Sequence, residues 1–593
     1  MKKITKALSV FLMLMLTLVP VSSYFAVGAE AAGGWVCSWA TSIVDSAISV
    51  ASLNLQDIIP AKSTIRIEFK VTTSGEKLRF KFSNEYGAAS VIFNEASVAK
   101  TAGEGKADID ASTAVPITFD GNSSVTIPAG ATVWSDTVEF PTEALDALSV
   151  SIYFENATYM TSSGLSNART FLGLRSIFRE EVSQCSAANI YSAREVNISS
   201  GTIVYHTTPF LCEVDTYSKT PKDVAVFIGD STLVNNTYLY FAEKLIKAGI
   251  TNVSVVNEAV VANKLLSDGT GIIGNLYGKA MLDRFQRDAL DIPGVKYIFV
   301  KIGLNDILHQ FSKSMGSDVP HPTVSDIIDG YKKLIKMAHE KGIKIYFFTK
   351  SPWKGYEREF LGQKGDITWT MEMQKMCDEL NEWIKTNTLA DGYIDCSPLA
   401  NPADEYALCP SFTPDGAHLT ALASVALADL IPVSYVGATN TSIKSVASLY
   451  KVDPYKEKKQ IIYDLEHPTE PATEEPTTKK PTEKPTQQAT ETTTKKEEST
   501  TAALTSAPSE EATTKPSYIP QEIVTVPVIS DPEETLRYEG LGVNPNYNIQ
   551  DDIPDEIGNG KSIAFLLILF TAIIISGAVV FIILTRKKEE EFE

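Results

Sequence analysis

The N-terminal third of the chain alternates between hydrophobic and polar positions. Residues 65–71 (I-R-I-E-F-K-V) and 78–82 (L-R-F-K-F) alternate strictly, and Ser74-Gly75 between them favours a turn. This pattern predicts a β-hairpin with one face in contact with solvent. Similar short runs, each bounded by turn residues, recur at 117–119, 125–127, 133–140, 148–154 and 203–206. Their spacing predicts an antiparallel β-sandwich over residues 32–217.

Two roles fit this first domain. It can bind carbohydrate through exposed aromatic side chains such as Tyr86 and Trp134, or it can be a packing partner that completes the next domain. Sequence alone does not separate exposed aromatic residues from those of a core, so both interpretations stay open.

From about residue 218 the pattern changes to apolar runs that alternate with amphipathic segments. Short apolar runs bounded by turns are typical of buried parallel strands. These runs lie at 224–228, 253–256, 297–302, 343–348 and 393–394, with helices between them at 237–248, 273–290, 323–341 and 371–386. A closing helix is predicted at 419–430. The pattern predicts an α/β fold, a doubly wound parallel five-stranded sheet, over residues 218–435.

The ends of the chain carry export and membrane signals. Lys2, Lys3 and Lys6 precede an apolar run at 8–21, and Ala29-Glu30-Ala31 forms a cleavage site. Residues 1–31 are therefore predicted to be a secretory signal peptide, with an uncleaved anchor as the alternative.

The C-terminal part is predicted to be a tether. After an extension at 436–468, residues 469–516 consist almost wholly of Thr, Pro, Glu, Lys, Ala and Ser, a composition typical of a disordered linker. A juxtamembrane segment, 517–561, leads to a transmembrane helix at 562–585 and a cytoplasmic tail at 586–593. A buried helix of a soluble domain is the alternative. We expect a single-pass cell-membrane protein with extracellular N-terminal domains.

Composition narrows the possible partners. The formal net charge of −20 argues against nucleic acid as a partner, because neutralising phosphates requires clustered Lys and Arg. The six cysteines form no CxxC or Cys/His cluster, so we predict neither a metal site nor a cofactor. Cys396 and Cys409 are close enough in sequence to form a disulfide in an exported protein.

Candidate chemistry begins where the first strand of the α/β domain ends. Gly229-Asp230-Ser231 lies at the predicted carboxyl edge of the sheet, where open α/β sheets bind ligands. Ser231 can be a nucleophile or a cap of the following helix.

Distant residues favour the nucleophile. A catalytic serine needs a base, a carboxylate to orient the base, and donors to the oxyanion. The spacing of Asp415 and His418 lets the carboxylate reach the imidazole, and Asn305 follows the strand at 297–302. Its amide can donate a hydrogen bond above the sheet. Lys301, inside that strand, has no explanation in the sequence.

These blocks together resemble the SGNH (GDSL-type) hydrolase family. Gly229-Asp230-Ser231, Gly303-Leu304-Asn305-Asp306 and Asp415-Gly416-Ala417-His418 correspond to its first, third and fifth blocks. The resemblance implies Ser231 as nucleophile, His418 as general base and later acid, and Asp415 as the orienting carboxylate. It also implies Asn305 and the N–H of Ser231 as oxyanion donors, with Gly229, Asp230, Gly303 and Asp306 supporting them.

The second block departs from the family pattern. It corresponds to residues 257–263, where the usual glycine positions hold Ala259 and Ala262. We predict that the N–H of Ala259 is the third oxyanion donor, although a Cβ restricts the backbone and crowds an acyl group. Segments 35–41, 78–87 and 127–136 also resemble the N-terminal β domain of a secreted bacterial two-domain subgroup.

The resemblance implies an esterase. Our first hypothesis is a surface-anchored serine esterase that hydrolyses short acyl groups, acetyl above all, on polysaccharide. The alternatives are a lipase or lysophospholipase-like acylhydrolase, and a glycan-binding adhesin that has kept the fold without activity. No apolar lid is evident between residues 350 and 370, which counts against the lipase.

Overall fold

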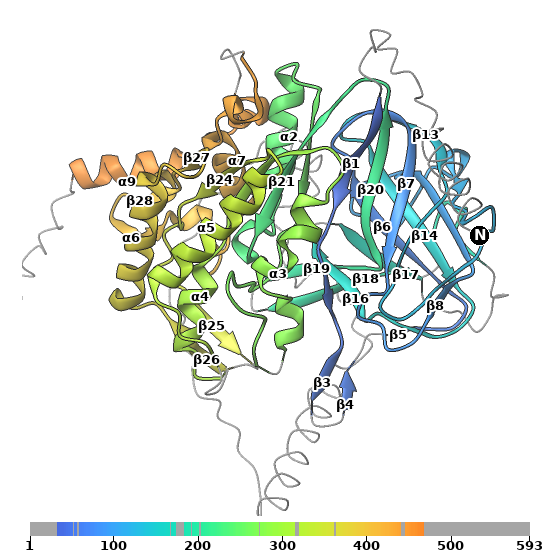
Figure 1. Cartoon of the computed structure of the whole chain (residues 1–593). Coiled ribbons are helices and arrows are strands. Elements are labelled where there is room, and N and C mark those ends of the chain that lie inside the picture. The colour runs from blue at the N-terminus through green and yellow to red at the C-terminus, as the bar shows by residue number, and fades with distance from the viewer. Residues whose placement is uncertain are drawn as a thin grey trace, which may run out of the picture.

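The computed structural model describes residues 33–467, except 51–52, 56–57, 167, 174–182, 191–192, 201–202, 272, 315–318, 361–362 and 440–444. The predicted signal peptide, linker and transmembrane helix lie outside this part. Among the described residues, none of the helices combines the length and the apolar character needed to cross a bilayer. Figure 1 shows a β-rich part, coloured blue to cyan, beside an α/β part, coloured green to orange.

The β-rich part, residues 33–218, is called the β domain below. One antiparallel sheet has the order β1 (Gly34–Ala40), β20 (Leu211–Ser218), β7 (Gly75–Ser83), β12 (Thr132–Trp134), with β13 (Val138–Thr142) also paired to β7. The other runs β10 (Val115–Pro116), β9 (Glu95–Lys100), β14 (Ala147–Phe154), β6 (Ser63–Lys70), β17 (Arg169–Gly173), β18 (Ala193–Ser200), β19 (Ile203–Pro209), β16 (Ser162–Ser166), β2 (Ile43–Asp45). Three short pairs complete it: β3 (Ile48–Val50) with β4 (Leu53–Leu55), β5 (Ile58–Ile59) with β15 (Thr158–Tyr159), and β8 (Val91–Phe93) with β11 (Val125–Ile127).

The predicted hairpin of residues 65–71 and 78–82 is wrong. Both segments are strands, but β6 pairs with β14 and β17, whereas β7 pairs with β20, β12 and β13. The chain crosses between the two sheets at the turn. Side chains from both strands, such as Ile67 and Phe80, lie fully buried in one core. Alternation therefore predicted the strands correctly but not their partners.

The α/β part is built on a parallel sheet whose five described strands match the predicted ones. Their order is β22 (Val253–Asn257), β21 (Asp223–Gly229), β23 (Val295–Lys301), β24 (Lys344–Phe348) and β27 (Gly392–Ile394). All neighbouring strands run parallel. Continuous apolar runs fit this arrangement because each strand is covered on both faces.

Helices cover the two faces of the sheet. One face packs against α3 (Met281–Phe285), α5 (Val324–Glu340) and α6 (Met371–Thr386), and the other against α2 (Thr237–Lys247) and α7 (Ala421–Leu430). The predicted helix at 273–290 is wrong as one element. It is divided into a short turn, Gly274–Tyr277, then α3 and a π-helical turn, Gln286–Leu290, because Gly278 with φ +69° ends the first turn.

Shorter elements surround the sheet edge. They include α4 (Leu304–Leu308), the hairpin of β25 (Glu357–Phe360) and β26 (Gln363–Thr368), and β28 (Ala400–Asn401) with β29 (Asp404–Leu408). In the extension at 436–468, α8 (Val446–Tyr450) packs against α7 and α2, and α9 (Lys456–Glu466) follows.

The β domain packs directly on the α/β domain. Strand β1 lies against the edge strand β22, and Val36 and Cys37 join the apolar core beneath the sheet. Buried hydrogen bonds cross the boundary, including Thr72 Oγ1 to Ser254 Oγ at 2.8 Å. The two domains therefore share one packed interface. All six cysteines, Cys396 and Cys409 among them, are free thiols.

Candidate active site

Ser231 lies in a turn that the strand geometry fixes. Strand β21 ends at Gly229, where a Cβ would lie 2.4 Å from the carbonyl oxygen of Lys301, so only glycine fits. The side chain of Asp230 then caps the turn at residues 231–233 by accepting the N–H of Thr232 at 3.0 Å. The following helix, α2, begins at Thr237 and has Asn236 at its N-cap, so the alternative role of Ser231 as the cap of that helix is wrong.

Lys301 supports the same turn. Its side chain is buried inside the sheet edge, and its Nζ donates to Thr232 Oγ1 at 2.6 Å. Thr232 Oγ1 in turn donates to Asp230 Oδ1 at 2.7 Å. This buried chain of hydrogen bonds explains a lysine in a strand that is otherwise apolar.

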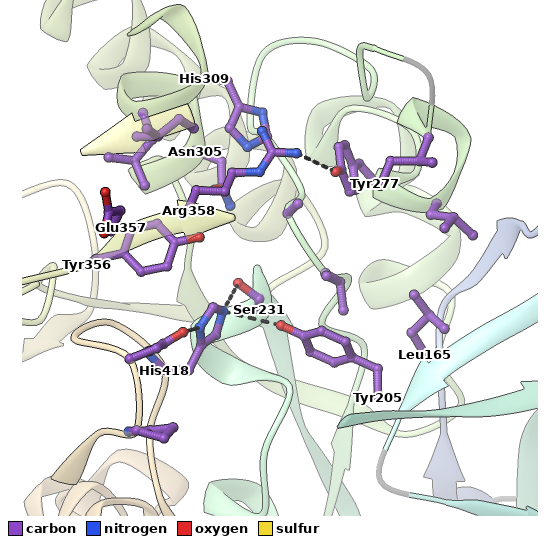
Figure 2. A pocket seen from close by; sticks show the side chains of 18 of the residues that line it. Leu165, Tyr205, Ser231, Tyr277, Asn305, His309, Tyr356, Glu357, Arg358 and His418 are labelled. Atoms are coloured by element: carbon purple, nitrogen blue, oxygen red, sulfur yellow. Dashed lines mark hydrogen bonds and ion pairs between the residues drawn. The ribbon is translucent and has the colours of Figure 1, made fainter. Parts of the chain in front are cut away.

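His418 and Asp415 approach Ser231 from the loop before α7. His418 Nε2 lies 2.9 Å from Ser231 Oγ, and His418 Nδ1 lies 2.6 Å from Asp415 Oδ2. Gly416 makes this loop possible, since it has φ +95° and a Cβ there would lie 2.5 Å from the backbone N of Tyr356. The structure thus brings the three predicted residues into one hydrogen-bonded row. Figure 2 shows the contact between His418 and Ser231.

The carboxylate of Asp415 is held in its charged form. Its Oδ1 accepts the backbone N–H groups of Ala417 at 3.0 Å and His418 at 2.9 Å. Burial opposes ionisation, but the hydrogen bond and charge of His418, with these N–H groups, lower the pKa of Asp415 to about 2. An ionised Asp415 accepts from Nδ1–H, which leaves Nε2 as the acceptor for the Ser231 hydroxyl.

Asn305 lies at the start of α4, directly beyond β23. Gly303, with φ +96°, turns the chain into this helix. Asn305 lines the cavity beside Ser231, and one hydrogen of its Nδ2 is donated to Asn263 O at 3.1 Å. Among the described residues no acceptor takes its second amide hydrogen, so this hydrogen can be donated to a ligand. Asp306 has a structural role, because its carboxylate accepts a hydrogen bond from the backbone N–H of Leu265 at 2.8 Å.

The prediction for Ala259 is wrong. Ala259 is buried, and its N–H already donates to Asn257 Oδ1 at 3.1 Å. Ala262 instead lines the cavity with Ser231, and no hydrogen bond among the described residues uses its N–H. Ala262 also has φ +54°, the left-handed conformation that glycine favours. Both alanines occupy positions where the family places glycine, and the backbone conformation assigns the donor role to Ala262 instead of Ala259.

The cavity above Ser231 has a volume of about 370 Å³. Tyr205 and Leu165 reach it from the β domain, as Figure 2 shows. The Tyr205 hydroxyl lies 3.3 Å from His418 Nε2, the nitrogen that also contacts Ser231. Sequence reasoning missed Tyr205, because a tyrosine in a β-strand carries no signal of an active site in another domain.

A charged hairpin and aromatic rings form the rest of the wall. Arg358, on β25, pairs with Asp366 at 2.9 Å and donates to the Tyr277 hydroxyl at 2.8 Å. Tyr356 also lines the cavity, and its ring centroid lies 6.0 Å from that of His418. The β25–β26 hairpin, which lies within residues 350–370, therefore presents polar groups to the cavity.

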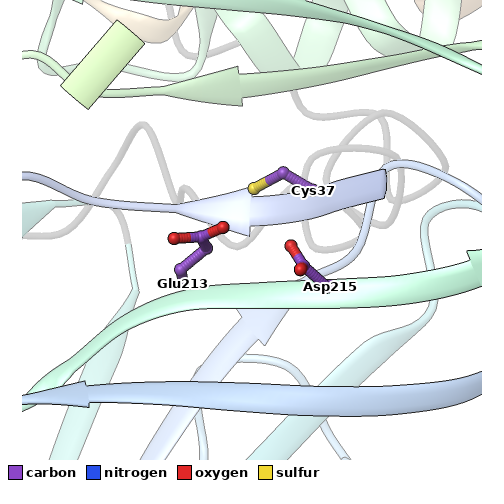
Figure 3. A group of neighbouring side chains, drawn as sticks. All are labelled: Cys37, Glu213 and Asp215. Carbon is purple, nitrogen blue, oxygen red and sulfur yellow. The ribbon is translucent and has the colours of Figure 1, made fainter. Parts of the chain in front are cut away.

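One group among the described residues has the spacing of a metal site. Cys37, Glu213 and Asp215 lie in the β domain beside the domain boundary (Figure 3). Two basic side chains already contact its carboxyl groups, because Arg79 Nη2 lies 2.6 Å from Asp215 Oδ2 and Lys81 Nζ lies 3.0 Å from Glu213 Oε2. The group therefore belongs to a network of acidic and basic side chains within the β domain.

Comparison with known proteins identifies the α/β domain. Residues 226–431 match the model of the family described as GDSL-like lipase/acylhydrolase. No curated protein matches the chain. Similar solved structures include a GDSL-like lipase from Bacteroides thetaiotaomicron, at 13% identity and TM-score 0.26, covering 36% of this chain and 88% of that one.

Two further solved structures are described as acetyl xylan esterases. AlAXEase has 18% identity and TM-score 0.26, with 35% of this chain and 96% of that one covered. A catalytic mutant of Axe2 from Geobacillus stearothermophilus has 15% identity and TM-score 0.28, with 35% and 92% covered. The matched family and the arrangement at Ser231 lead to one conclusion: residues 226–431 are a GDSL-like lipase/acylhydrolase domain, and the chain is a carboxylic ester hydrolase.

Proposed function

We propose that the protein is a serine esterase that hydrolyses short acyl esters, acetyl esters above all, on carbohydrate at the cell surface. The observation that carries the reaction type is the row of Ser231, His418 and Asp415, with contacts of 2.9 and 2.6 Å. This is the arrangement that activates a serine for acyl transfer.

The reaction then runs in two halves. Ser231 Oγ attacks the ester carbonyl while its proton passes to His418 Nε2, and the protonated imidazole gives this proton to the leaving alcohol. A water molecule next loses a proton to Nε2 and attacks the acyl group on Ser231. As the bond between Ser231 Oγ and the acyl carbon breaks, Nε2 gives this proton to Oγ, which releases the carboxylic acid and restores both residues. Asp415 stays ionised throughout, because its low pKa keeps it ready to stabilise the imidazolium.

The oxyanion would be bound by three N–H donors. The N–H groups of Ser231 and Ala262 and the free hydrogen of Asn305 Nδ2 belong to residues that line the same cavity. Donors placed in advance stabilise the negative charge that develops on the carbonyl oxygen, and removal of one such donor costs roughly 10² to 10³ in kcat.

The residues that line the cavity favour a substrate with a short acyl group and a sugar-like alcohol. Glu357, Arg358 and Lys364 of the β25–β26 hairpin line it, and a long alkyl chain would have to desolvate these charges. Tyr205, Tyr277 and Tyr356 combine an apolar ring with a hydroxyl, which suits the mixed surface of a sugar.

The location is also part of the proposal. The signal peptide at 1–31 and the uncharged run at 563–584 would place the enzyme outside the cell on a membrane anchor. The intervening Pro- and Thr-rich tract, if extended, could reach on the order of 150 Å. Such a tether would let the site act on polymers near the surface.

A panel of aryl esters with the full-length protein tests the reaction and the acyl length. Ser231→Ala should lose activity on p-nitrophenyl acetate by about a thousandfold or more. Ser397→Ala, at an exposed position outside the cavity, is the matched control and should retain activity. Unchanged turnover in Ser231→Ala would remove the proposed nucleophile. A higher kcat/KM for decanoate than for acetate would remove the short-acyl specificity.

A further inference from the structure

A buried arginine joins the two backbone segments that form the site. Arg284 on α3 is 3% exposed, and its Nη2 donates to the carbonyl of Gly229 at 3.2 Å, two residues before Ser231. Its Nη1 donates to the carbonyl of Glu258 at 2.8 Å, and its Nε to Asn263 Oδ1 at 3.1 Å. Glu258 and Asn263 flank the loop at 259–262, which carries Ala262. Arg284 therefore fixes the nucleophile turn relative to this loop.

The β domain supplies a partner of this arginine. Ser42, between β1 and β2, is 2% exposed, and its Oγ accepts from Arg284 Nη1 at 2.9 Å. The same oxygen lies 2.7 Å from Glu258 Oε2 and 2.9 Å from Asp288 Oδ2. One hydroxyl of the β domain thus bridges Arg284 to the two buried acids beside it.

Ion pairs also hold the cluster around Arg284, which consists of Arg284, Ser42, Glu258 and Asp288. Asp288 pairs with Arg284 at 3.1 Å and with Arg287 at 2.5 Å. Burial raises the pKa of Glu258 well above its usual value, which favours the neutral form of its carboxyl. A buried polar network of this kind holds its members rigidly only while each hydrogen bond is made. Loss of the Ser42 hydroxyl would leave Arg284 with fewer restraints.

We propose that Ser42 is a positioning residue of the esterase site, through which the β domain acts on the nucleophile turn and the oxyanion loop by way of Arg284. The inference rests on the proposed function. Misplacement of catalytic groups by about 1 Å can cost 10²-fold in rate. Because the oxyanion donor acts in the transition state, the effect should fall on kcat and leave KM nearly unchanged.

Two substitutions at one position separate hydrogen bonding from packing. Ser42→Ala removes the hydroxyl, and Ser42→Cys fills the volume with a weak hydrogen-bonding group. Both should lower kcat for p-nitrophenyl acetate by roughly tenfold to a hundredfold, with KM changed less than about twofold and thermal unfolding close to wild type. If only volume mattered, Ser42→Cys would behave as wild type, and the proposal would be wrong.

Ser254→Ala is the matched control. Ser254, on strand β22, is a fully buried serine at the same domain boundary. Its Oγ donates a hydrogen bond to Cys37 O at 2.7 Å and lies 2.8 Å from Thr72 Oγ1, so it has no contact with Arg284 in these hydrogen bonds. We expect it to retain kcat. An equal loss of kcat in Ser254→Ala, or kcat within twofold of wild type in Ser42→Ala, would overturn the role of Ser42. If the wild-type protein hydrolyses no ester in the same assay, the proposed function itself is contradicted.

Discussion

Ala262 holds a backbone conformation that its side chain disfavours. Its φ of +54° lies in the left-handed region, at a cost of roughly 1 kcal/mol for a residue with a Cβ, and Ala262 is one of the residues that line the cavity. Ala262→Gly should therefore keep the N–H donor and enlarge the acyl site. We expect the ratio of kcat/KM for p-nitrophenyl butyrate over acetate to rise. A ratio that falls would show that the Cβ does not limit acyl size.

Tyr205 is placed to assist the leaving group. Its hydroxyl lies 3.3 Å from His418 Nε2, close to where the leaving oxygen receives its proton. Tyr205→Phe should slow hydrolysis of an alkyl acetate by about tenfold, the worth of one hydrogen bond. It should slow p-nitrophenyl acetate less than about twofold, because that leaving group needs little protonation. Equal effects on both substrates would contradict this role.

Local motifs explain which site residues the sequence could predict. Asp415 and His418 are three positions apart, and Ser231 and Asn305 each follow a strand that is evident as an apolar run. Tyr205 could not be found, because its approach to His418 depends on how two domains pack. The sequence could not show which alanine of the second block, Ala259 or Ala262, supplies the oxyanion donor. The positive backbone φ of Ala262 separates the two, and it is seen only in the structure.

The pairing of strands was predicted well in the parallel sheet, where burial makes the apolar runs continuous, and wrongly for β6 and β7, whose partners are distant in sequence. Each predicted strand of the parallel sheet is present, because runs such as 224–228 are covered on both faces. The hairpin of β6 and β7 failed, because alternation and a turn fit a crossing between sheets equally well. The helix at 273–290 failed at Gly278, whose φ no periodicity predicts.

Strand β20 carries a carboxyl group that should make stability depend on pH. Burial, then the nearby Glu213, raises the pKa of Asp215 to about 7 despite its pairing with Arg79. The folded state therefore binds more protons than the unfolded state between about pH 4 and pH 7. Its contribution to the free energy of unfolding is largest below about pH 4 and is lost as the pH rises through 7.

Asp215→Asn tests this sign, because asparagine stays neutral at every pH. The stability of the variant relative to wild type should be higher at pH 8 than at pH 4.5. Urea unfolding followed by tryptophan fluorescence at the two pH values measures the difference. A relative stability that is equal at both pH values, or lower at pH 8, would show that Asp215 is not the group that titrates.

The two folded domains form one enzyme. The β domain gives Tyr205 and Leu165 to the cavity and Ser42 to the cluster around Arg284. Of the two roles that the sequence left open, packing partner or carbohydrate binder, the contacts support the first and extend it to the site. Periodicity within each domain could not predict this, because the contacts join residues more than 200 positions apart.

The proposed anchor predicts where the whole molecule is found. Removing residues 563–593 from the expressed chain should move ester hydrolysis from the membrane fraction to the culture medium, because the uncharged run would no longer hold the protein. Activity measured in both fractions, with the full-length chain as control, checks it. Activity that stays with the membrane after the deletion would contradict anchoring by this segment.

The proposed function depends on Ser231 as the activated nucleophile of an acyl-transfer site. The most direct measurement is the mass of the protein after reaction with a fluorophosphonate, which loses fluoride as it phosphonylates an activated serine. We predict one adduct per chain, mapped by peptide mass to Ser231, absent in Ser231→Ala and formed far more slowly in His418→Ala. An adduct on another residue, or labelling that persists in Ser231→Ala, would contradict the claim.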